Sequence, residues 1–189
     1  MKAKLILLAV LAALAVAGAA LAAESVVIKG TSGNDVLTGT PGNDRIYARA
    51  GDDQVAALDG NDRVFGSWGN DSIDLGAGDD FARGGPGADN IVGGEGNDRI
   101  RGRRGDDVLD GGAGNDRIHG GRGADQLQGG DGDDVLFMLA RDRRPDVADC
   151  GPGNDKVWVN VKETQDTFAN CEVVYRVKVS RAQEVDDEN

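Results

Sequence analysis

Aspartate recurs every nine residues through the middle of the chain, and a glycine always stands two residues before it. Carboxylate oxygens at a fixed spacing are the groups that bind hard divalent cations, so this pattern indicates metal binding. The period runs without a gap through twelve nonapeptides from Gly30 to Phe137. We expect the metal ligands to be the sixth-place aspartates, together with one in a later degenerate repeat: Asp35, Asp44, Asp53, Asp62, Asp71, Asp80, Asp89, Asp98, Asp107, Asp116, Asp125, Asp134 and Asp155.

The remaining places of the nonapeptide indicate how the chain positions these aspartates. A fixed internal period is typical of a solenoid, in which each unit buries its apolar side only against its neighbours. Glycine at the fourth place, and often at the first two, allows a tight turn rich in carbonyls over the first six residues. The eighth place is Leu, Ile or Val except at Ala82, so the last three residues predict a strand with one buried face. Two nonapeptides then complete one coil of 18 residues.

Stacked coils place like charges close together. Turns 18 residues apart lie about one strand spacing from each other, roughly 4.8 Å. Unit charges at about 5 Å repel by roughly 3 kcal/mol at an effective dielectric near 20. Over two columns of carboxylates this exceeds the roughly 5 to 15 kcal/mol by which domains are stable, so an ordered coil needs cations between its turns.

The type of cation and its link to folding follow from the same residues. Carboxylate and carbonyl oxygens favour Ca²⁺, whose six to eight ligands are arranged less strictly than those of Mg²⁺. One inward aliphatic residue per nine is a thin core, so we expect metal binding to be coupled to folding. The alternative is a disordered Gly/Asp-rich segment, but disorder does not keep three positions in phase over twelve periods.

Three segments carry a family resemblance: GGEGNDRIR from Gly93, GGAGNDRIH from Gly111 and GGDGDDVLF from Gly129. They resemble the RTX, or hemolysin-type, calcium-binding nonapeptide repeat. The resemblance implies a right-handed parallel β-roll in which sixth-place carboxylates and turn carbonyls of successive coils share each Ca²⁺, with about ten ions as the upper bound. The expected fold class is therefore all-β: a right-handed parallel β-roll (β-solenoid) of about six 18-residue coils with a short C-terminal β cap.

Several repeats depart from the family pattern. Most departures at the second place precede Leu75, so we expect weaker sites in the first half of the roll and earlier folding of the second half. Asn or Asp at the fifth place, as at Asn34, is either a further ligand or a residue that stabilises the turn, and the pattern favours the second role. Glycine is absent from the first place at Ala48, Ala57 and Leu75, and from the second place at Thr31, Thr40, Arg49, Leu58, Ser67 and Arg103.

The N-terminus predicts secretion. Residues 1–22 combine Lys2 and Lys4 with an apolar run and the ending Ala20-Leu21-Ala22, as in a secretory signal peptide. An uncleaved membrane anchor is the alternative, and no second apolar stretch is long enough to span a bilayer. Residues 23–29 are expected to be a lead-in to the roll at 30–137.

After the roll, residues 138–180 predict a cap that covers the last coil and includes the degenerate repeat. Its two cysteines, Cys150 and Cys171, suit a disulfide in an oxidising compartment, whereas a catalytic or metal-thiolate pair is disfavoured. The acidic tail at 181–189 is expected to be disordered.

Composition and charge narrow the function. The chain has 33 acidic and 21 basic residues, a net charge of −12, which argues against nucleic acid as a partner. A helical metalloprotease signature or a catalytic triad would need more than His119, which stands at a ninth place and should face solvent. Paired-carboxylate chemistry would need a groove that a bare roll lacks. We therefore expect a protein that is not an enzyme.

One face of the expected roll is unusual in charge. If the seventh and ninth places face outward, the face built from alternate strands carries six arginines and no acidic residue, and the other face carries no basic residue. We hypothesise that this face docks an anionic extracellular partner such as acidic polysaccharide, lipid head groups or a protein. The alternative is that the arginines only offset the negative charge of the turns and cover the exposed surface of the sheet. The six arginines are Arg45, Arg63, Arg83, Arg99, Arg101 and Arg117.

Together these features predict a secreted, extracellular and monomeric β-roll that folds on binding multiple Ca²⁺ ions and has no enzymatic activity. Two alternatives remain open. One is a recognition or adhesion module that calcium makes rigid, and the other is the roll of an RTX-type enzyme or toxin.

Overall fold

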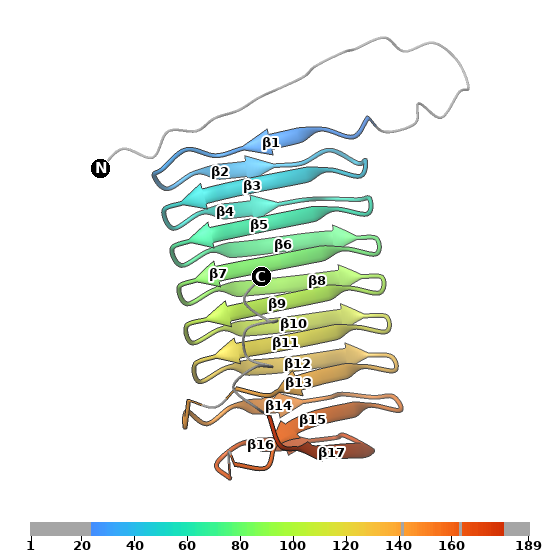
Figure 1. The fold of residues 1–189 in the computed structure, drawn as a ribbon. Helices are drawn as coiled ribbons and strands as arrows, with labels where there is room; N and C mark the ends of the chain where they lie inside the picture. The colour runs from blue at the N-terminus through green and yellow to red at the C-terminus, as the bar shows by residue number, and fades with distance from the viewer. Residues whose placement is uncertain (1–23, 141, 163, 180–189) are drawn as a thin grey trace, which may run out of the picture.

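The computed structural model describes residues 24–140, 142–162 and 164–179, in which every helix or strand assigned is a β-strand. The strands stack as successive rungs along one axis, from β1 at the top of Figure 1 to β17 at the bottom. The expected signal peptide at 1–22 and the acidic tail at 181–189 lie outside the described residues. Within those residues there is no helix that could span a membrane.

Two parallel sheets form the walls of the roll. Odd-numbered strands make a nine-stranded sheet and even-numbered strands an eight-stranded sheet, so the chain crosses from one sheet to the other at each turn. The odd strands are β1 (Val27–Lys29), β3 (Arg45–Ala50), β5 (Arg63–Trp68), β7 (Phe81–Pro86), β9 (Arg99–Arg104), β11 (Arg117–Arg122), β13 (Val135–Met138), β15 (Lys156–Asn160) and β17 (Val173–Val177). The even strands are β2 (Val36–Thr38), β4 (Gln54–Ala56), β6 (Ser72–Ala77), β8 (Asn90–Glu95), β10 (Val108–Ala113), β12 (Gln126–Asp131), β14 (Val147–Asp149) and β16 (Thr167–Ala169).

The register confirms the coil of two nonapeptides. From β1 to β13 each paired residue lies opposite the residue 18 positions later, as Ile46 does with Val64 and Leu109 with Leu127. Residues at the same place of alternate repeats therefore form a column along the axis, on either the inside or the outside of the roll. The all-β parallel β-solenoid expected from the period is therefore the observed fold.

The strands are longer than the period alone predicts. Most run for six residues, from the seventh place of one repeat to the third place of the next, as in β9. The turn is correspondingly shorter than the six residues expected. Glycines at the first and second places therefore lie in extended segments that pair with their neighbours, as Gly112 pairs with Gly130.

Two sets of side chains fill the core. The eighth-place residues are buried in every repeat, including Ala82, and Phe81 stays on the outer face instead of turning inward. The first place also points inward, since Ala48, Ala57 and Leu75 are all fully buried in the same cluster. A glycine at the first place therefore leaves space inside the coil, which becomes important at the metal site.

The roll extends beyond the twelve nonapeptides at both ends. Strand β1 lies in the expected lead-in and pairs with β3. Strands β14 to β17, in the expected cap, continue both sheets, so the roll has about eight coils instead of six. Pairing between β12 and β14 spans 21 residues because three extra residues stand between Asp134 and Asp146.

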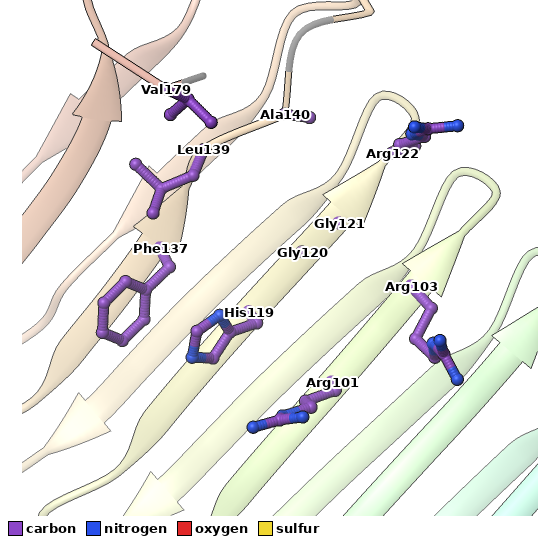
Figure 2. Close-up of a pocket in the computed structure, with 10 residues that line it drawn as sticks. All are labelled: Arg101, Arg103, His119, Gly120, Gly121, Arg122, Phe137, Leu139, Ala140 and Val179. Carbon is purple, nitrogen blue, oxygen red and sulfur yellow. The ribbon is translucent and has the colours of Figure 1, made fainter. Parts of the chain in front are cut away.

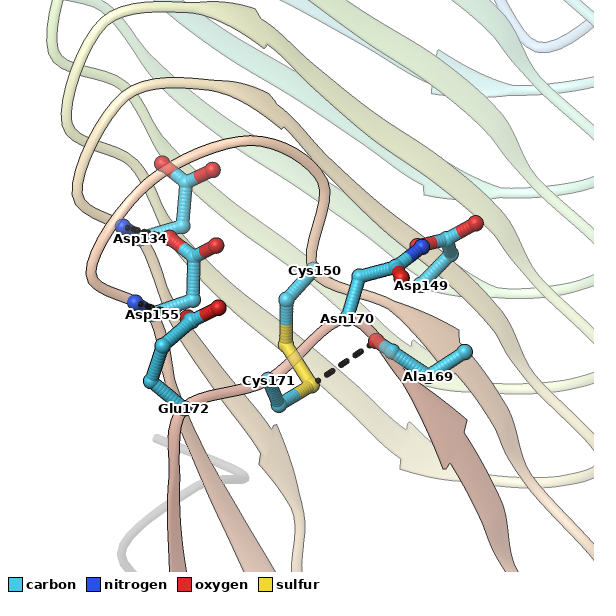
Figure 3. The surroundings of a disulfide bond; sticks show 8 residues. All are labelled: Asp134, Asp149, Cys150, Asp155, Ala169, Asn170, Cys171 and Glu172. Carbon is cyan, nitrogen blue, oxygen red and sulfur yellow. Dashed lines mark hydrogen bonds between the residues drawn. A yellow bond between two sulfur atoms is a disulfide. The ribbon is translucent and has the colours of Figure 1, made fainter.

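A disulfide joins the last two coils. Cys150 and Cys171 are bonded, as expected, over a separation of 21 residues. Figure 3 shows the bond beside the successive turns that carry Asp134 and Asp155. Cys150 stands at a first place and is fully buried, so the sulfur fills the same interior position that glycine leaves open elsewhere.

Four second-place residues have a backbone conformation that favours glycine. Arg49, Leu58, Ser67 and Arg103 have φ between 83° and 93°, and the second-place glycines from Gly76 onward also have positive φ. An L-residue in this region costs roughly 1 to 2 kcal/mol. The non-glycine second places in the middle of the roll are therefore strained.

We expect Leu58→Gly to stabilise the calcium-loaded roll by about 1 kcal/mol, because it removes this strain and loses a side chain that is 40% exposed. Thermal unfolding at saturating calcium measures the effect. The matched control is Gly76→Ala, one coil later, whose Cβ would collide with the carbonyl of Leu58 and should lower the melting temperature. A Leu58→Gly variant that melts at or below the wild-type temperature would contradict the strain argument.

Candidate metal centre

The sixth-place aspartates form two internal columns. Each of the twelve side chains is at most 3% exposed, because it points into the coil at the end of the turn. One column follows the odd repeats, from Asp35 to Asp125, and the other follows the even repeats, from Asp44 to Asp134. The structure thus assembles all twelve predicted aspartates, and Asp155 extends the second column.

One oxygen of each carboxylate holds the stack together. Oδ1 of an aspartate accepts a hydrogen bond from the backbone N–H of the aspartate one coil earlier, at 2.6 to 3.0 Å through the twelve repeats. For example, Asp107 Oδ1 accepts from Asp89 and in turn Asp125 Oδ1 accepts from Asp107. These bonds fix the direction of the carboxylate and leave its second oxygen for another partner.

The second oxygen has no partner in most repeats. Oδ2 is buried and without a hydrogen bond in ten of the twelve sixth-place aspartates: Asp53, Asp62, Asp71, Asp80, Asp89, Asp98, Asp107, Asp116, Asp125 and Asp134. A buried carboxylate oxygen without a donor costs free energy, and proteins rarely leave such groups unsatisfied. Ten of them in register indicate that a group outside the protein chain completes their coordination.

In five of these repeats a main-chain oxygen of the next coil lies beside the first-place glycine together with Oδ2. At Gly111, an added Cβ would collide with Oδ2 of Asp116 and with the carbonyl oxygen of Gly129, one coil later. The same pair of oxygens surrounds Gly93 and Gly102. Because this glycine has no Cβ, a carboxylate oxygen and a carbonyl oxygen of adjacent coils can converge beside it, and such oxygens are the ligands that Ca²⁺ prefers.

Within the described residues, no three acidic, histidine or cysteine side chains converge on one point. Aspartates of one column are a full coil apart, so a cation between them would need main-chain carbonyls for the rest of its shell. Such carbonyls are present in every turn, and the residues therefore fit a Ca²⁺ ion even though the side chains alone would not.

The first two repeats are an exception. Oδ2 of Asp35 accepts from the backbone N–H and hydroxyl of Thr31, and Oδ2 of Asp44 accepts from the same groups of Thr40. A threonine at the second place thus satisfies the oxygen that is unpartnered elsewhere. These two aspartates lie in the predicted columns, but their second oxygens are already occupied by the protein.

Three further repeats have a carbon atom where glycine would leave space. Ala48, Ala57 and Leu75 stand at the first place beside Asp53, Asp62 and Asp80, and all three are buried. Seven repeats therefore combine the glycine space with an unpartnered Oδ2, and most of them lie in the second half: Asp71, Asp89, Asp98, Asp107, Asp116, Asp125 and Asp134.

The columns continue into the cap through residues that the sequence pattern did not reveal. Oδ1 of Asp146 accepts from the N–H of Asp125, and Oδ1 of Asp166 accepts from Asp146. In the other column the Asp155 N–H donates to Glu172, which takes the place of an aspartate; Figure 3 shows Asp134, Asp155 and Glu172 one above another. Three inserted residues break the phase before Asp146, although the Asp-Val-Ala-Asp spacing still marks a turn and a strand.

Fifth-place side chains stabilise the turns. Asn34 Oδ1 accepts the N–H of Asp52, and Asn43 Oδ1 accepts the N–H of Asn61, in each case across one coil. The same bond recurs along both edges of the roll. The role favoured from the sequence, turn stabilisation instead of metal ligation, accounts for these contacts.

Burial makes the ionised form of the carboxylates costly. Desolvation is the largest cause that raises their pKa, the N–H donated from the previous coil lowers it, and neighbouring carboxylates mostly raise it further. The pKa of Asp107 rises to about 8 and that of Asp80 and Asp89 to about 7. The pKa rises to about 6 at Asp62, Asp71, Asp98, Asp116, Asp125 and Asp134.

The only histidine of the chain belongs to an aromatic stack. His119 lies on the outer face, as expected, but it is half-buried and stacks on Phe137 at 4.0 Å between ring centroids. Burial, and then Arg101 and Arg117, lower its pKa to about 4, so it is neutral at pH 7. Figure 2 shows it in a pocket of about 50 Å³, which has room for a few water molecules only.

A comparison with family profiles identifies the class of protein. The RTX calcium-binding nonapeptide repeat matches four times, over residues 29–60, 50–82, 83–118 and 111–137. These matches span more than half of the chain and include both columns from Asp35 to Asp134. The chain belongs to the RTX calcium-binding repeat family. A comparison with curated proteins finds no match.

We expect Asp107→Asn to lower the number of calcium ions bound per chain. The substitution removes the charge of a metal ligand in a repeat with a first-place glycine and an Oδ2 that no protein group satisfies. Asp44→Asn is the matched control, since Thr40 already occupies the second oxygen of Asp44. Elemental analysis of gel-filtered protein gives the calcium-to-protein ratio. An equal loss of bound calcium in the two variants would show that the threonine contacts do not prevent calcium binding in the repeats that have them.

The raised pKa values also predict a pH effect on the chain in metal-free buffer. A group with a raised folded-state pKa contributes stability that is present below its unfolded value, near 3.8, and lost as pH rises through the folded value. We therefore expect more β structure at pH 5 than at pH 8, measured by circular dichroism with light scattering to detect aggregation. Equal signals at the two pH values would contradict this expectation.

Proposed function

We propose that this protein is a secreted calcium-binding β-roll that folds when Ca²⁺ ions fill the spaces between its stacked turns, and that it has no enzymatic activity. The observation that carries the proposal is the series of buried Oδ2 atoms that lack a hydrogen-bond donor. Ions between adjacent coils would satisfy these oxygens and cancel the repulsion along each column.

We further propose that the ions occupy the seven repeats that combine a first-place glycine with an Oδ2 atom that has no hydrogen-bond partner. The second half of the roll would then bind more calcium than the first. Thr31 and Thr40 would close the first coil without metal. Ala48, Ala57 and Leu75 would weaken the next sites by filling the interior with carbon.

Secretion is supported by two features of the chain. Residues 1–22 have the composition of a signal peptide. The Cys150–Cys171 disulfide is typical of proteins in oxidising compartments. Extracellular calcium modules often bind in the roughly 0.1 to 1 mM range, so calcium met on export would trigger folding.

The experiment is a far-UV circular dichroism titration of residues 23–189. We expect little β signal in excess chelator at pH 7.5, a cooperative gain with Ca²⁺ and a weaker response to Mg²⁺, because unligated columns repel and Mg²⁺ needs a stricter shell. A full β signal in chelator, or an equal response to the two metals, would overturn the proposal.

A further inference from the structure

The two outer faces of the roll differ in charge. We name the outer face of the nine-stranded sheet the arginine face. Its side chains are the seventh- and ninth-place residues of the odd-numbered strands from β1 to β17. No acidic residue stands in these rows, whereas the opposite face carries Asp74, Asp110 and Asp149 and no basic residue. The cations of the arginine face are Lys29, Arg45, Arg63, Arg83, Arg99, Arg101, Arg117 and Lys156.

A groove of about 1130 Å³ runs along one side of this face. We name it the arginine groove. It crosses the coils from β1 to β9. On the strand side it is lined by Arg45, Arg63, Arg83 and Arg99, and on the turn side by the fifth-place residues Asn43, Asn61, Asp79 and Asn97. The column aspartates Asp44, Asp62 and Asp80 line it as well, and these are the carboxylates that bound calcium would neutralise. Phe65 and Phe81 also line it, and both rings are only half-buried. The groove therefore follows the axis of the roll and presents an arginine and an asparagine in three of its coils, whereas Phe81 and Asp79 stand at these places in the coil between Arg63 and Arg99.

Three arginines of the groove are available to a partner. Within the described part of the chain, no carboxylate lies within salt-bridge distance of Arg45, Arg63 or Arg99. A chain with a net charge of −12 has many carboxylates that could have neutralised them. Arg45 and Arg63 are paired on adjacent strands, and Arg99 follows in the same row beyond Phe81. With no acidic neighbour on the sheet, this row concentrates positive charge along a line.

The turn side of the groove supplies hydrogen-bond donors. Oδ1 of Asn43 and of Asn61 accepts a backbone N–H from the next coil, which leaves their NH₂ groups as donors. Phe65 and Phe81 lie 5.8 Å apart between centroids and offer ring surface on the strand side. Guanidinium groups, amide donors and aromatic rings together suit a ligand with carboxylates, hydroxyls and flat C–H faces.

We propose that the arginine groove binds a linear carboxylated polysaccharide, a chain of uronate sugars that lies parallel to the axis of the roll. Its carboxylates would pair with the arginine row, its hydroxyls would accept from the asparagines, and its sugar faces would pack on the phenylalanines. The coil spacing of about 4.8 Å is close to the length of one sugar along an extended chain, so contacts can repeat from coil to coil. An elongated groove suits a single chain better than the plane of a membrane.

The test uses isothermal titration of the calcium-loaded protein with a hexamer of galacturonate, which is too short to gel with calcium. We expect binding that weakens as salt rises and that falls by about tenfold or more in the triple variant Arg45→Gln, Arg63→Gln, Arg99→Gln, because each exposed charge contact is worth up to a few-fold in affinity. A neutral hexamer such as maltohexaose should not bind.

The matched control is the triple variant Arg49→Gln, Arg103→Gln, Arg143→Gln, which removes the same charge outside the groove and should bind as the wild type does. Circular dichroism in calcium confirms that each variant is folded, which separates failure of this inference from failure of the proposed calcium-dependent folding. Three outcomes would overturn the inference: no binding of the uronate hexamer by folded protein, equal losses in the two triple variants, or binding of phosphatidylserine vesicles or an oligonucleotide instead of the hexamer.

Discussion

The structure depends on carboxylates that are buried in register and only half satisfied by the protein. One oxygen of each aspartate joins adjacent coils through a backbone N–H, so the carboxylate cannot turn away to solvent without breaking the stack. The other oxygen is held in a space without a donor. The same interaction that aligns the coils therefore creates the demand for a cation, and stacking and metal binding are two aspects of one constraint.

The first place of the repeat determines whether that demand can be met. It points into the coil, next to the second oxygen and to a carbonyl of the adjacent coil. Where this place is glycine, the two oxygens can lie beside the backbone. Where it is Leu75, Met138 or Cys150, an apolar side chain lies there instead and belongs to the core. The chain thus exchanges metal coordination for packing at single positions, and the fold tolerates both because the strands on either side stay the same.

Most of the fold and of the site follows from the period. The 18-residue coil, the inward eighth place, the aspartate columns and the bond between Cys150 and Cys171 could all be predicted, because each depends on residues that recur in phase or occur once. The charge difference between the two faces also follows from alternation along the strands.

Other features could not be predicted because they depend on contacts that spacing does not encode. The inward direction of the first place is hidden where glycine has no side chain, so Ala48 and Leu75 looked like turn residues. Beyond Asp134 only Asp155 was predicted. Asp146 and Asp166 were missed because three inserted residues break the phase, and Glu172 was missed because it replaces an aspartate. The capping of Asp35 by Thr31 depends on the local turn geometry, which a change from glycine to threonine does not reveal.

The closed ends have a mechanical consequence. Threonines satisfy the aspartates of the first coil and a disulfide joins the last two coils, so withdrawal of the proposed ions would act mainly on the coils between them. The twelve nonapeptides rise by about 30 Å when wound into six coils. As a flexible glycine-rich chain, the same residues span about 55 Å. If the coils unfold without calcium, as proposed above, the distance between the two ends of the roll would depend on the calcium concentration.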